Sequence, residues 1–182
     1  MSQAIFLDRD GVLNEAIFRA GISCPPATLD EFRILPGVCD ACALLKEAGF
    51  LLIVVTNQPD VSRGSVAMET VEAINQELRA GLPVDEIRTC YHDDSHKCSC
   101  RKPNPGLLLQ AAIDWKIDIA GSFMVGDRWK DIEAGKRAGC RTILIDQGTS
   151  LPGNLSPDHR AKSLLEAAGW IIQQASVVQE GE

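Results

Sequence analysis

The chain has 182 residues, which is enough for one domain with its own hydrophobic core, and its 45% hydrophobic and 24% charged residues exclude a largely disordered protein. Its net charge of −7 gives no general attraction to nucleic acid or to anionic membranes. No secretory signal is recognisable before Asp8, and the longest strongly apolar run, residues 50–55, is far shorter than the about 20 residues of a membrane-spanning helix. We therefore expect a cytoplasmic, single-domain protein over residues 1–182, with no nucleic acid or membrane partner.

Apolar runs alternate with helical patterns along the chain. The predicted strands cover residues 4–7, 51–55, 87–91, 123–126 and 142–146. The first predicted helix opens at Pro36-Gly37 and ends at Gly49, and the others cover residues 68–78, 105–115, 131–138 and 163–173. This alternation predicts an α/β fold with a doubly wound parallel sheet covered on both faces. Two segments, residues 15–30 and 93–104, are predicted to be irregular loops, where functional residues concentrate.

Acidic side chains follow two of the predicted strands. Asp8 and Asp10 come directly after the first strand, and Asp127 comes after the fourth. Because the carboxyl ends of parallel strands share one edge of the sheet, we expect one common site there. Asp8 suits a nucleophile that attacks phosphorus, and Asp10 suits the group that donates and later accepts a proton. A single Asp-x-Asp is more often a turn or a helix cap, so the prediction depends on this conjunction.

Charge neutralisation at such a site requires a divalent cation and fixed donors. Mg²⁺ prefers oxygen ligands, and the predicted set is Asp8, the backbone carbonyl of Asp10, and Asp127. Three groups are expected to hold phosphate oxygens: Thr56, the amide of Asn57, and Lys102. Local basic clusters, Arg101-Lys102 and Arg128 with Lys130, are further candidate anion contacts.

A polar loop gathers soft metal ligands. Cys90, His92, Cys98 and Cys100 predict a closed Cys₃His zinc site, although its one-residue gaps are tighter than usual zinc spacings and His96 is a competing ligand. Free surface thiols are the disfavoured alternative, because clustered thiols are prone to oxidation. Four protein ligands leave no open position, so this Zn²⁺ would be structural. It would fix the loop that aims Lys102 at the phosphate and Arg101 at the substrate.

The segments Phe6–Gly11 and Gly126–Asp131, together with Thr56 and Lys102, resemble the motifs of the haloacid dehalogenase superfamily. The resemblance covers about residues 4–148. It implies an aspartyl-phosphate mechanism with Mg²⁺, and it implies that Asp131 orients the site from behind the metal ligands, with a simple acid at a helix start as the alternative.

The cysteine loop, with its Cys-Arg-Lys-Pro ending, is similar to that of the capless branch that contains the histidinol-phosphate and heptose-bisphosphate phosphatases. Thr56-Asn57-Gln58 followed by Arg63-Gly64 is closer to the heptose enzymes, which implies that Gln58 and Arg63 are also substrate contacts. Pro59-Asp60 and Ala16–Arg19 depart from the heptose pattern, in loops that face the leaving group in that family.

The expected activity is therefore removal of the 7-phosphate of a heptose bisphosphate, for bacterial surface polysaccharide synthesis. The expected partner is a small phosphorylated metabolite, and the expected state is a monomer. Histidinol phosphate or another small sugar phosphate is the alternative substrate. The alternative from another functional class is a zinc-dependent binding module without catalytic activity. The net charge of −7 argues against such a module that binds nucleic acid.

Overall fold

The computed structural model describes residues 1–19, 21–146, 148 and 150–179, and within the last helix it describes side chains through Ala175. The end of the predicted domain, residues 180–182, lies outside the described residues. The same holds for residues 20 and 147, which fall within the part of the chain that carries the predicted motifs.

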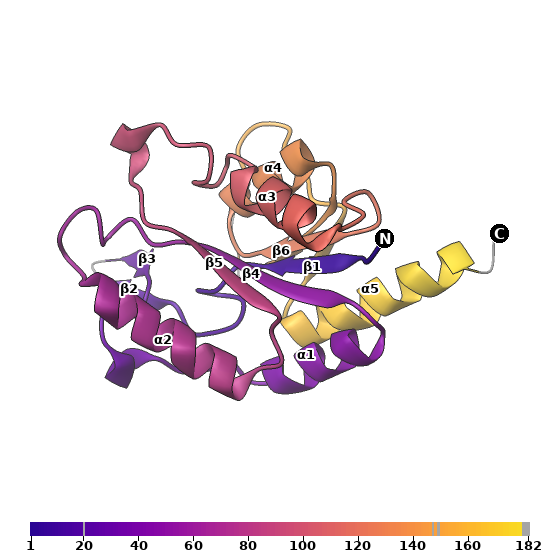
Figure 1. The fold of residues 1–182 in the computed structure, drawn as a ribbon, viewed down its shortest axis with the longest axis horizontal. Coiled ribbons are helices and arrows are strands. Elements are labelled where there is room, and N and C mark those ends of the chain that lie inside the picture. Colours follow the sequence, from indigo (N-terminus) through magenta and orange to yellow (C-terminus); the bar gives the residue numbers. More distant parts are fainter. Residues whose placement is uncertain (20, 147, 149, 180–182) are drawn as a thin grey trace.

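A parallel sheet forms the centre of the molecule (Figure 1). Its strand order is β5-β4-β1-β6-β7-β8, and every neighbouring pair is parallel. The strands are β1 (Ala4–Leu7), β4 (Leu51–Asn57), β5 (Glu86–Cys90), β6 (Phe123–Gly126), β7 (Arg141–Ile145) and β8 (His159–Ala161). The five predicted strands are all present, and the doubly wound α/β fold is confirmed.

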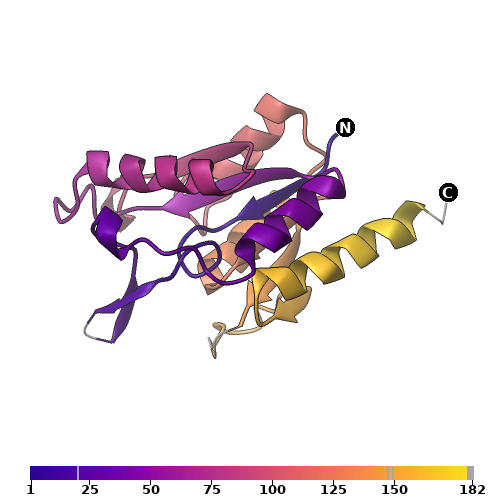
Figure 2. The same ribbon diagram turned by 90° about the horizontal axis from the view of Figure 1, so that it is seen from below.

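Helices cover both faces of this sheet (Figures 1 and 2). They are α1 (Val38–Glu47), α2 (Met68–Gly81), α3 (Gly106–Trp115), α4 (Trp129–Ala138) and α5 (Leu164–Gln179). Side chains alternate between the two faces of β1: Ile5 and Leu7 pack in the core with α1 and α5, whereas Phe6 packs in the core with α3 and α4. Among the described residues, no helix combines the length and the apolar character that a membrane crossing requires.

The segment predicted as an irregular loop over residues 15–30 is more regular than expected. It contains an antiparallel hairpin of β2 (Ile17–Arg19) and β3 (Ile22–Cys24), followed by the 3₁₀ turn η1 (Leu29–Glu31). The side chain of Arg19 helps to hold this segment together, because its guanidinium donates to Pro25 O at 3.0 Å and pairs with Glu31. The prediction of a loop without regular structure was therefore wrong for this segment.

Other differences are smaller. The second predicted loop contains a single 3₁₀ turn, η2 (Asp94–His96), and α5 runs six residues beyond its predicted end at residue 173. The short strand β8 was not predicted, and its His159 stacks on Trp170 with 4.4 Å between ring centroids. A strand of three residues is too short to show an apolar alternation in the sequence. The stability of β8 comes from its pairing with β7.

One prediction concerns the close packing of α4 on the sheet. A Cβ added at Gly135 would lie 2.7 Å from Met124 Cβ in β6 and 2.7 Å from Thr142 Cγ2 in β7. Gly135→Ala should therefore lower the free energy of unfolding by about 1–3 kcal/mol, because α4 must move away from the sheet. The matched variant Gly169→Ala in α5 has open space around its Cβ and should raise stability by about 0.5–1 kcal/mol. Urea unfolding followed by circular dichroism measures both, and equal effects would contradict the packing argument.

Candidate active site

The carboxyl ends of the central strands hold the predicted acidic residues. Asp8 follows β1, and its backbone N–H donates to Val125 O in β6 at 2.9 Å. Asp127 directly follows β6, and Thr56 lies near the end of β4. Since β1 is paired in parallel with β4 on one side and β6 on the other, these strand ends meet at one edge of the sheet.

A cavity of about 360 Å³ opens at this edge. The predicted site residues that line it are Asp8, Asp10, Asn57, Arg63, Arg101, Lys102 and Arg128. Asp127 lines a second cavity of about 460 Å³, to which Arg128 also contributes. Thr56 and Gln58 are buried, at 0% and 2% exposure, so they support the site from within the protein.

Lys102 is a buried cation at this cavity. Its Nζ lies 2.9 Å from Asp8 Oδ1 and 2.6 Å from Asp131 Oδ1. Burial alone would lower the pKa of Lys102, but Asp131 and Asp8 outweigh burial, and the pKa lies above its ordinary value. Lys102 is therefore a full ammonium group beside Asp8, where it can neutralise the charge of a phosphoryl group.

Three carboxylates crowd around the same place. One oxygen each from Asp8, Asp127 and Asp131 lies within 4.8 Å of the others. Burial raises the pKa of Asp8 to about 6, against the opposing effect of Lys102, and neighbouring aspartates add to the rise. Burial and the charges of Asp8 and Asp131 raise the pKa of Asp127 to about 8. The protein alone thus leaves this cluster with an excess of negative charge that is costly in a buried place.

The same cluster fits a divalent cation. Asp127 Oδ1 is buried and has no hydrogen-bond partner among the described residues, so an oxygen lone pair is open to a metal. Gly11, with a φ of 90°, makes room beside it, because a Cβ there would lie 2.3 Å from Asp127 Oδ2. Carboxylate oxygens without nitrogen or sulfur are the donor set that Mg²⁺ prefers.

The prediction named Asp10 as a metal ligand through its backbone carbonyl, so its carboxylate was not expected among these side chains. Asp131, rather than the carboxylate of Asp10, faces Asp8 and Asp127. Asp131 Oδ1 contacts Lys102, and Asp131 Oδ2 accepts from the backbone N–H of Arg128 at 3.0 Å. Both oxygens of Asp131 thus have protein partners, which is the arrangement of a residue that orients its neighbours.

The carboxylate of Asp10 is held by a fixed set of donors. Arg9 Nη2 donates to its two oxygens at 3.1 and 3.2 Å, Asn14 Nδ2 donates to Oδ1 at 3.0 Å, and Gln58 Nε2 donates to Oδ2 at 2.7 Å. Arg9 is fully buried, and its Nη1 donates to Asn75 Oδ1 at 3.0 Å. Sequence reasoning missed Arg9, Asn14 and Asn75. The one sequence signal for this network was Asn75, because a polar residue on the buried face of a helix needs a buried hydrogen-bond partner.

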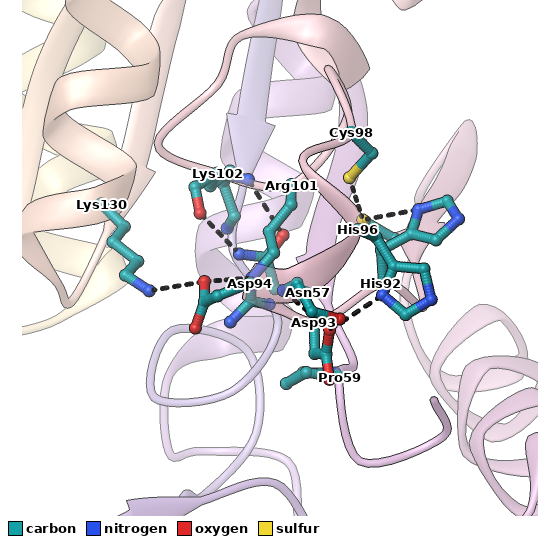
Figure 3. Close-up of polar contacts among 12 residues, drawn as sticks. Asn57, Pro59, His92, Asp93, Asp94, His96, Cys98, Arg101, Lys102 and Lys130 are labelled. Atoms are coloured by element: carbon teal, nitrogen blue, oxygen red, sulfur yellow. Dashed lines mark hydrogen bonds and ion pairs between the residues drawn. The ribbon is translucent and has the colours of Figure 1, made fainter. Parts of the chain in front are cut away.

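Asn57 and Thr56 act on their protein neighbours in this structure. Asn57 Nδ2 donates to Lys102 O at 3.0 Å, and the backbone N–H of Lys102 donates to Asn57 Oδ1 at 3.1 Å (Figure 3). This two-way contact joins the end of β4 to the loop that carries Lys102. Thr56 Oγ1 accepts from Gln58 Nε2 at 2.9 Å, so Thr56 helps to orient the side chain that holds Asp10.

Two of the predicted substrate contacts lie at the mouth of the cavity. Arg63 is exposed, and its Nη1 lies 3.2 Å from Asp60 Oδ1. Arg128 Nη2 donates to both the backbone oxygen and Oγ of Ser23, each at 3.1 Å, and so ties the start of α4 to the β2–β3 hairpin. The hairpin therefore forms a wall of the mouth. The described residues place no separate cap domain over it, as the resemblance implied.

The predicted zinc ligands come together in the loop after β5. Cys90 Sγ lies 3.7 Å from Cys98 Sγ, Cys98 Sγ lies 3.4 Å from Cys100 Sγ, and His92 Nδ1 lies 3.4 Å from Cys100 Sγ. Ligands about 2.3 Å from a tetrahedral Zn²⁺ are separated by roughly 3.7 Å. These spacings lie close to that value, whereas Cys90 Sγ and Cys100 Sγ are nearer to each other, at 3.0 Å. The chemistry of the donor set, three thiols and one imidazole, fits a zinc ion.

The competing ligand, His96, points elsewhere. Its Nδ1 lies 2.8 Å from Asp93 Oδ1, and its ring is tilted beside that of His92 with 5.0 Å between centroids (Figure 3). The group of side chains able to share one metal contains His92 and does not include His96 within the described part of the chain.

Comparison with known proteins gives consistent matches. The HAD-hydrolase-like family model matches residues 99–167. The chain is 39% identical over 158 residues to the D-glycero-beta-D-manno-heptose-1,7-bisphosphate 7-phosphatase of Yersinia pestis, covering 80% of this chain and 81% of that protein. It is 34% identical to the enzyme of the same name from Bordetella bronchiseptica, over 94% of this chain and 98% of that protein.

Solved structures agree. The crystal structure of D,D-heptose 1,7-bisphosphate phosphatase from B. bronchiseptica, complexed with magnesium and phosphate, superposes with a TM-score of 0.82 at 32% identity, covering 94% of this chain and 99% of that one. A HAD-like phosphatase from Mesorhizobium loti superposes with a TM-score of 0.76 at 30% identity, covering 95% of this chain and 87% of that one. These relatives are more than 30% identical to this chain over most of their own length and of its length, and they share its fold. Together with the acidic residues at the strand ends, this shows that the chain is a phosphatase of the haloacid dehalogenase superfamily, in the family of the heptose-bisphosphate phosphatases.

Proposed function

We propose that this phosphatase removes the 7-phosphate of D-glycero-D-manno-heptose 1,7-bisphosphate, a small phosphorylated sugar. The observation that carries the proposal is the meeting of Asp8 and Lys102 at the floor of a cavity whose mouth has more cationic than anionic side chains. The cations at the mouth are Arg63, Arg101, Arg128 and Lys130, and the anions there are Asp60 and Asp94. The names of the relatives support the same substrate.

The size and charge of the cavity suit such a substrate. A volume of about 360 Å³ lies at the lower end of the range for small-molecule sites, about 300–1,000 Å³. A doubly phosphorylated sugar brings one phosphate to the floor and leaves a second negative group near the mouth, where the excess of cations would attract it. We propose that residues 1–182 act as a single cytoplasmic domain and a monomer.

In the first step, a carboxylate oxygen of Asp8 attacks the phosphorus of the 7-phosphate. The bond between phosphorus and the sugar oxygen breaks, and Asp10 donates a proton to that oxygen as it leaves. Lys102 offsets the negative charge on the transferred phosphoryl group. The donors around Asp10, namely Arg9, Asn14 and Gln58, keep its carboxyl group at the cavity.

In the second step, water attacks the phosphorus of the aspartyl phosphate on Asp8. Asp10 accepts a proton from this water, the bond between Asp8 and phosphorus breaks, and inorganic phosphate is released. Asp8, Asp127 and the backbone carbonyl of Asp10 would hold Mg²⁺. When bound, this ion supplies Lewis-acid stabilisation of the phosphoryl oxygens and balances the crowded carboxylates.

The zinc loop has a positional part in this proposal. Cys90, His92, Cys98 and Cys100 would hold a structural Zn²⁺ with no open coordination position. The chain continues directly into Arg101 and Lys102, so a fixed metal cluster would set the start of both side chains.

The first test is Asp8→Asn. Removal of the nucleophile should lower phosphate release by at least about 10³-fold in the presence of Mg²⁺. The fold should persist and can gain stability, because the substitution relieves the crowding of carboxylates around Asp127 and Asp131. Single-turnover phosphate assays measure the activity and urea unfolding measures the stability. Undiminished hydrolysis by a folded Asp8→Asn protein would exclude the proposed nucleophile.

The second test compares substrates. The purified protein with Mg²⁺ should hydrolyse D-glycero-D-manno-heptose 1,7-bisphosphate with a kcat/KM at least about tenfold above that for histidinol phosphate or for simple hexose phosphates. The physical reason is that only the bisphosphate offers a second phosphate to the cations at the mouth. A preference for histidinol phosphate would replace the substrate, and equally poor turnover of the whole panel would remove both names while leaving the phosphatase chemistry in place.

The third test is Cys98→Ser. Loss of one thiolate should reduce the zinc content from near one ion per chain to a small fraction, and it should weaken hydrolysis because Lys102 is no longer held by a fixed loop. The matched control is Cys39→Ser, since Cys39 is an exposed cysteine in α1, outside the cluster. Metal analysis and phosphate assays provide the readouts. A wild-type protein that is fully active without zinc would contradict this role.

A further inference from the structure

We propose that Asp94 is a positioning and specificity-determining residue that aims Arg101 at the second anionic group of the substrate. Asp94 begins η2 in the zinc loop, and its side chain is 71% exposed at the mouth of the cavity. Arg101 Nε donates to Asp94 Oδ1 at 2.9 Å, and Lys130 Nζ lies 3.8 Å from the same oxygen (Figure 3). This inference rests on the proposed function, because it concerns the part of the substrate away from the reacting phosphate.

The state of Arg101 carries the first part of the argument. Arg101 is 9% exposed and lines the cavity, and its Nη1 is buried without a hydrogen-bond partner among the described residues. A buried guanidinium N–H with no acceptor costs free energy, so the vacant donor is best explained by an anion that binds there. The guanidinium group is planar and rigid, and the bond from Nε to Asp94 therefore fixes the direction of Nη1 as well.

The location of Asp94 carries the second part. The carboxylate of Asp94 is largely exposed, and solvent therefore weakens its ion pair with the buried Arg101, so the contact is poorly explained as a stabilising pair. Instead one oxygen of Asp94 serves cations from two elements: Arg101 in the zinc loop and Lys130 in α4. Asp94 thus joins the two sides of the mouth.

The neighbouring residue supports a ligand of Arg101 other than the reacting phosphate. Lys102 extends to the floor, where it contacts Asp8 and Asp131. Arg101, one residue earlier, is anchored to Asp94 at the mouth (Figure 3). The two consecutive cations therefore address opposite ends of a bound molecule, and a sugar with two phosphate groups satisfies both.

The test uses two variants and two substrates. Asp94→Ala removes the acceptor of Arg101 Nε, whereas Asp94→Asn keeps an oxygen acceptor and removes the charge. The readout is the ratio of kcat/KM for D-glycero-D-manno-heptose 1,7-bisphosphate to that for the heptose 7-phosphate. In the wild type this ratio should exceed about tenfold. Asp94→Ala should lower the ratio about tenfold, through KM for the bisphosphate, and Asp94→Asn should restore most of it.

The control is Asp114→Ala. Asp114 is likewise an exposed partner of an arginine, with its Oδ2 at 2.7 Å from Arg88 Nη2, but it lies in α3 and outside the cavity lining. Its removal should leave the ratio unchanged. The zinc content of all variants should equal that of the wild type, which separates positioning of Arg101 from loss of the metal cluster.

The contrary results are distinct. If both Asp94 variants bind the bisphosphate more tightly, Asp94 competes with the substrate and the positioning role is overturned; a wild-type ratio near one also overturns it. If the wild type turns over neither heptose phosphate, the substrate assignment fails. The role of Asp94 is then tested with p-nitrophenyl phosphate as the substrate and with fructose 1,6-bisphosphate and fructose 6-phosphate as inhibitors. Asp94→Ala should selectively weaken inhibition by the bisphosphate. Equal inhibition constants of the two fructose phosphates for the wild type would overturn the proposal.

Discussion

The crowding of buried carboxylates around one lysine is the constraint on which the rest of the site depends. Asp8, Asp127 and Asp131 approach one another closely, and Lys102 supplies a single positive charge among them. Burial raises the pKa of Asp8 and of Asp127, so the protein gives up stability to keep these groups together. The fold meets this cost with a sheet whose buried strands deliver the acids at fixed positions, and a bound cation would complete the charge balance.

The position of Lys102 depends on supports from separate parts of the chain. Asn57 at the end of β4 binds the backbone of Lys102 on both sides, and the cysteine cluster immediately precedes it. Lys102 comes from a loop, and loops are less precise than strands for holding a side chain within a few tenths of an ångström. The amide contact holds this loop in place, and a Zn²⁺ ion bound by the neighbouring cysteines and His92 would add to its rigidity.

The sequence predicted the five central strands and all five helices, because long apolar runs and helical spacing are local signals. The sequence also predicted that Asp8 and Asp127 meet at one edge of the sheet, because the carboxyl ends of parallel strands share that edge. The hairpin of β2 and β3 and the strand β8 were missed, because strands of three residues are too short to show a recognisable apolar alternation. Asn75 of α2 was missed because its contact with Arg9 joins residues that lie 66 positions apart in the chain.

The β2–β3 hairpin has a consequence for how this enzyme can change over evolution. It forms a wall of the mouth, its tether to α4 is the contact between Arg128 and Ser23, and Phe18 at its surface remains 72% exposed. None of its residues belongs to the buried sheet that holds the acids. Mutations in this appendage can therefore reshape which molecules enter without disturbing the reacting groups, so selectivity and chemistry are able to diverge independently in descendants of this chain.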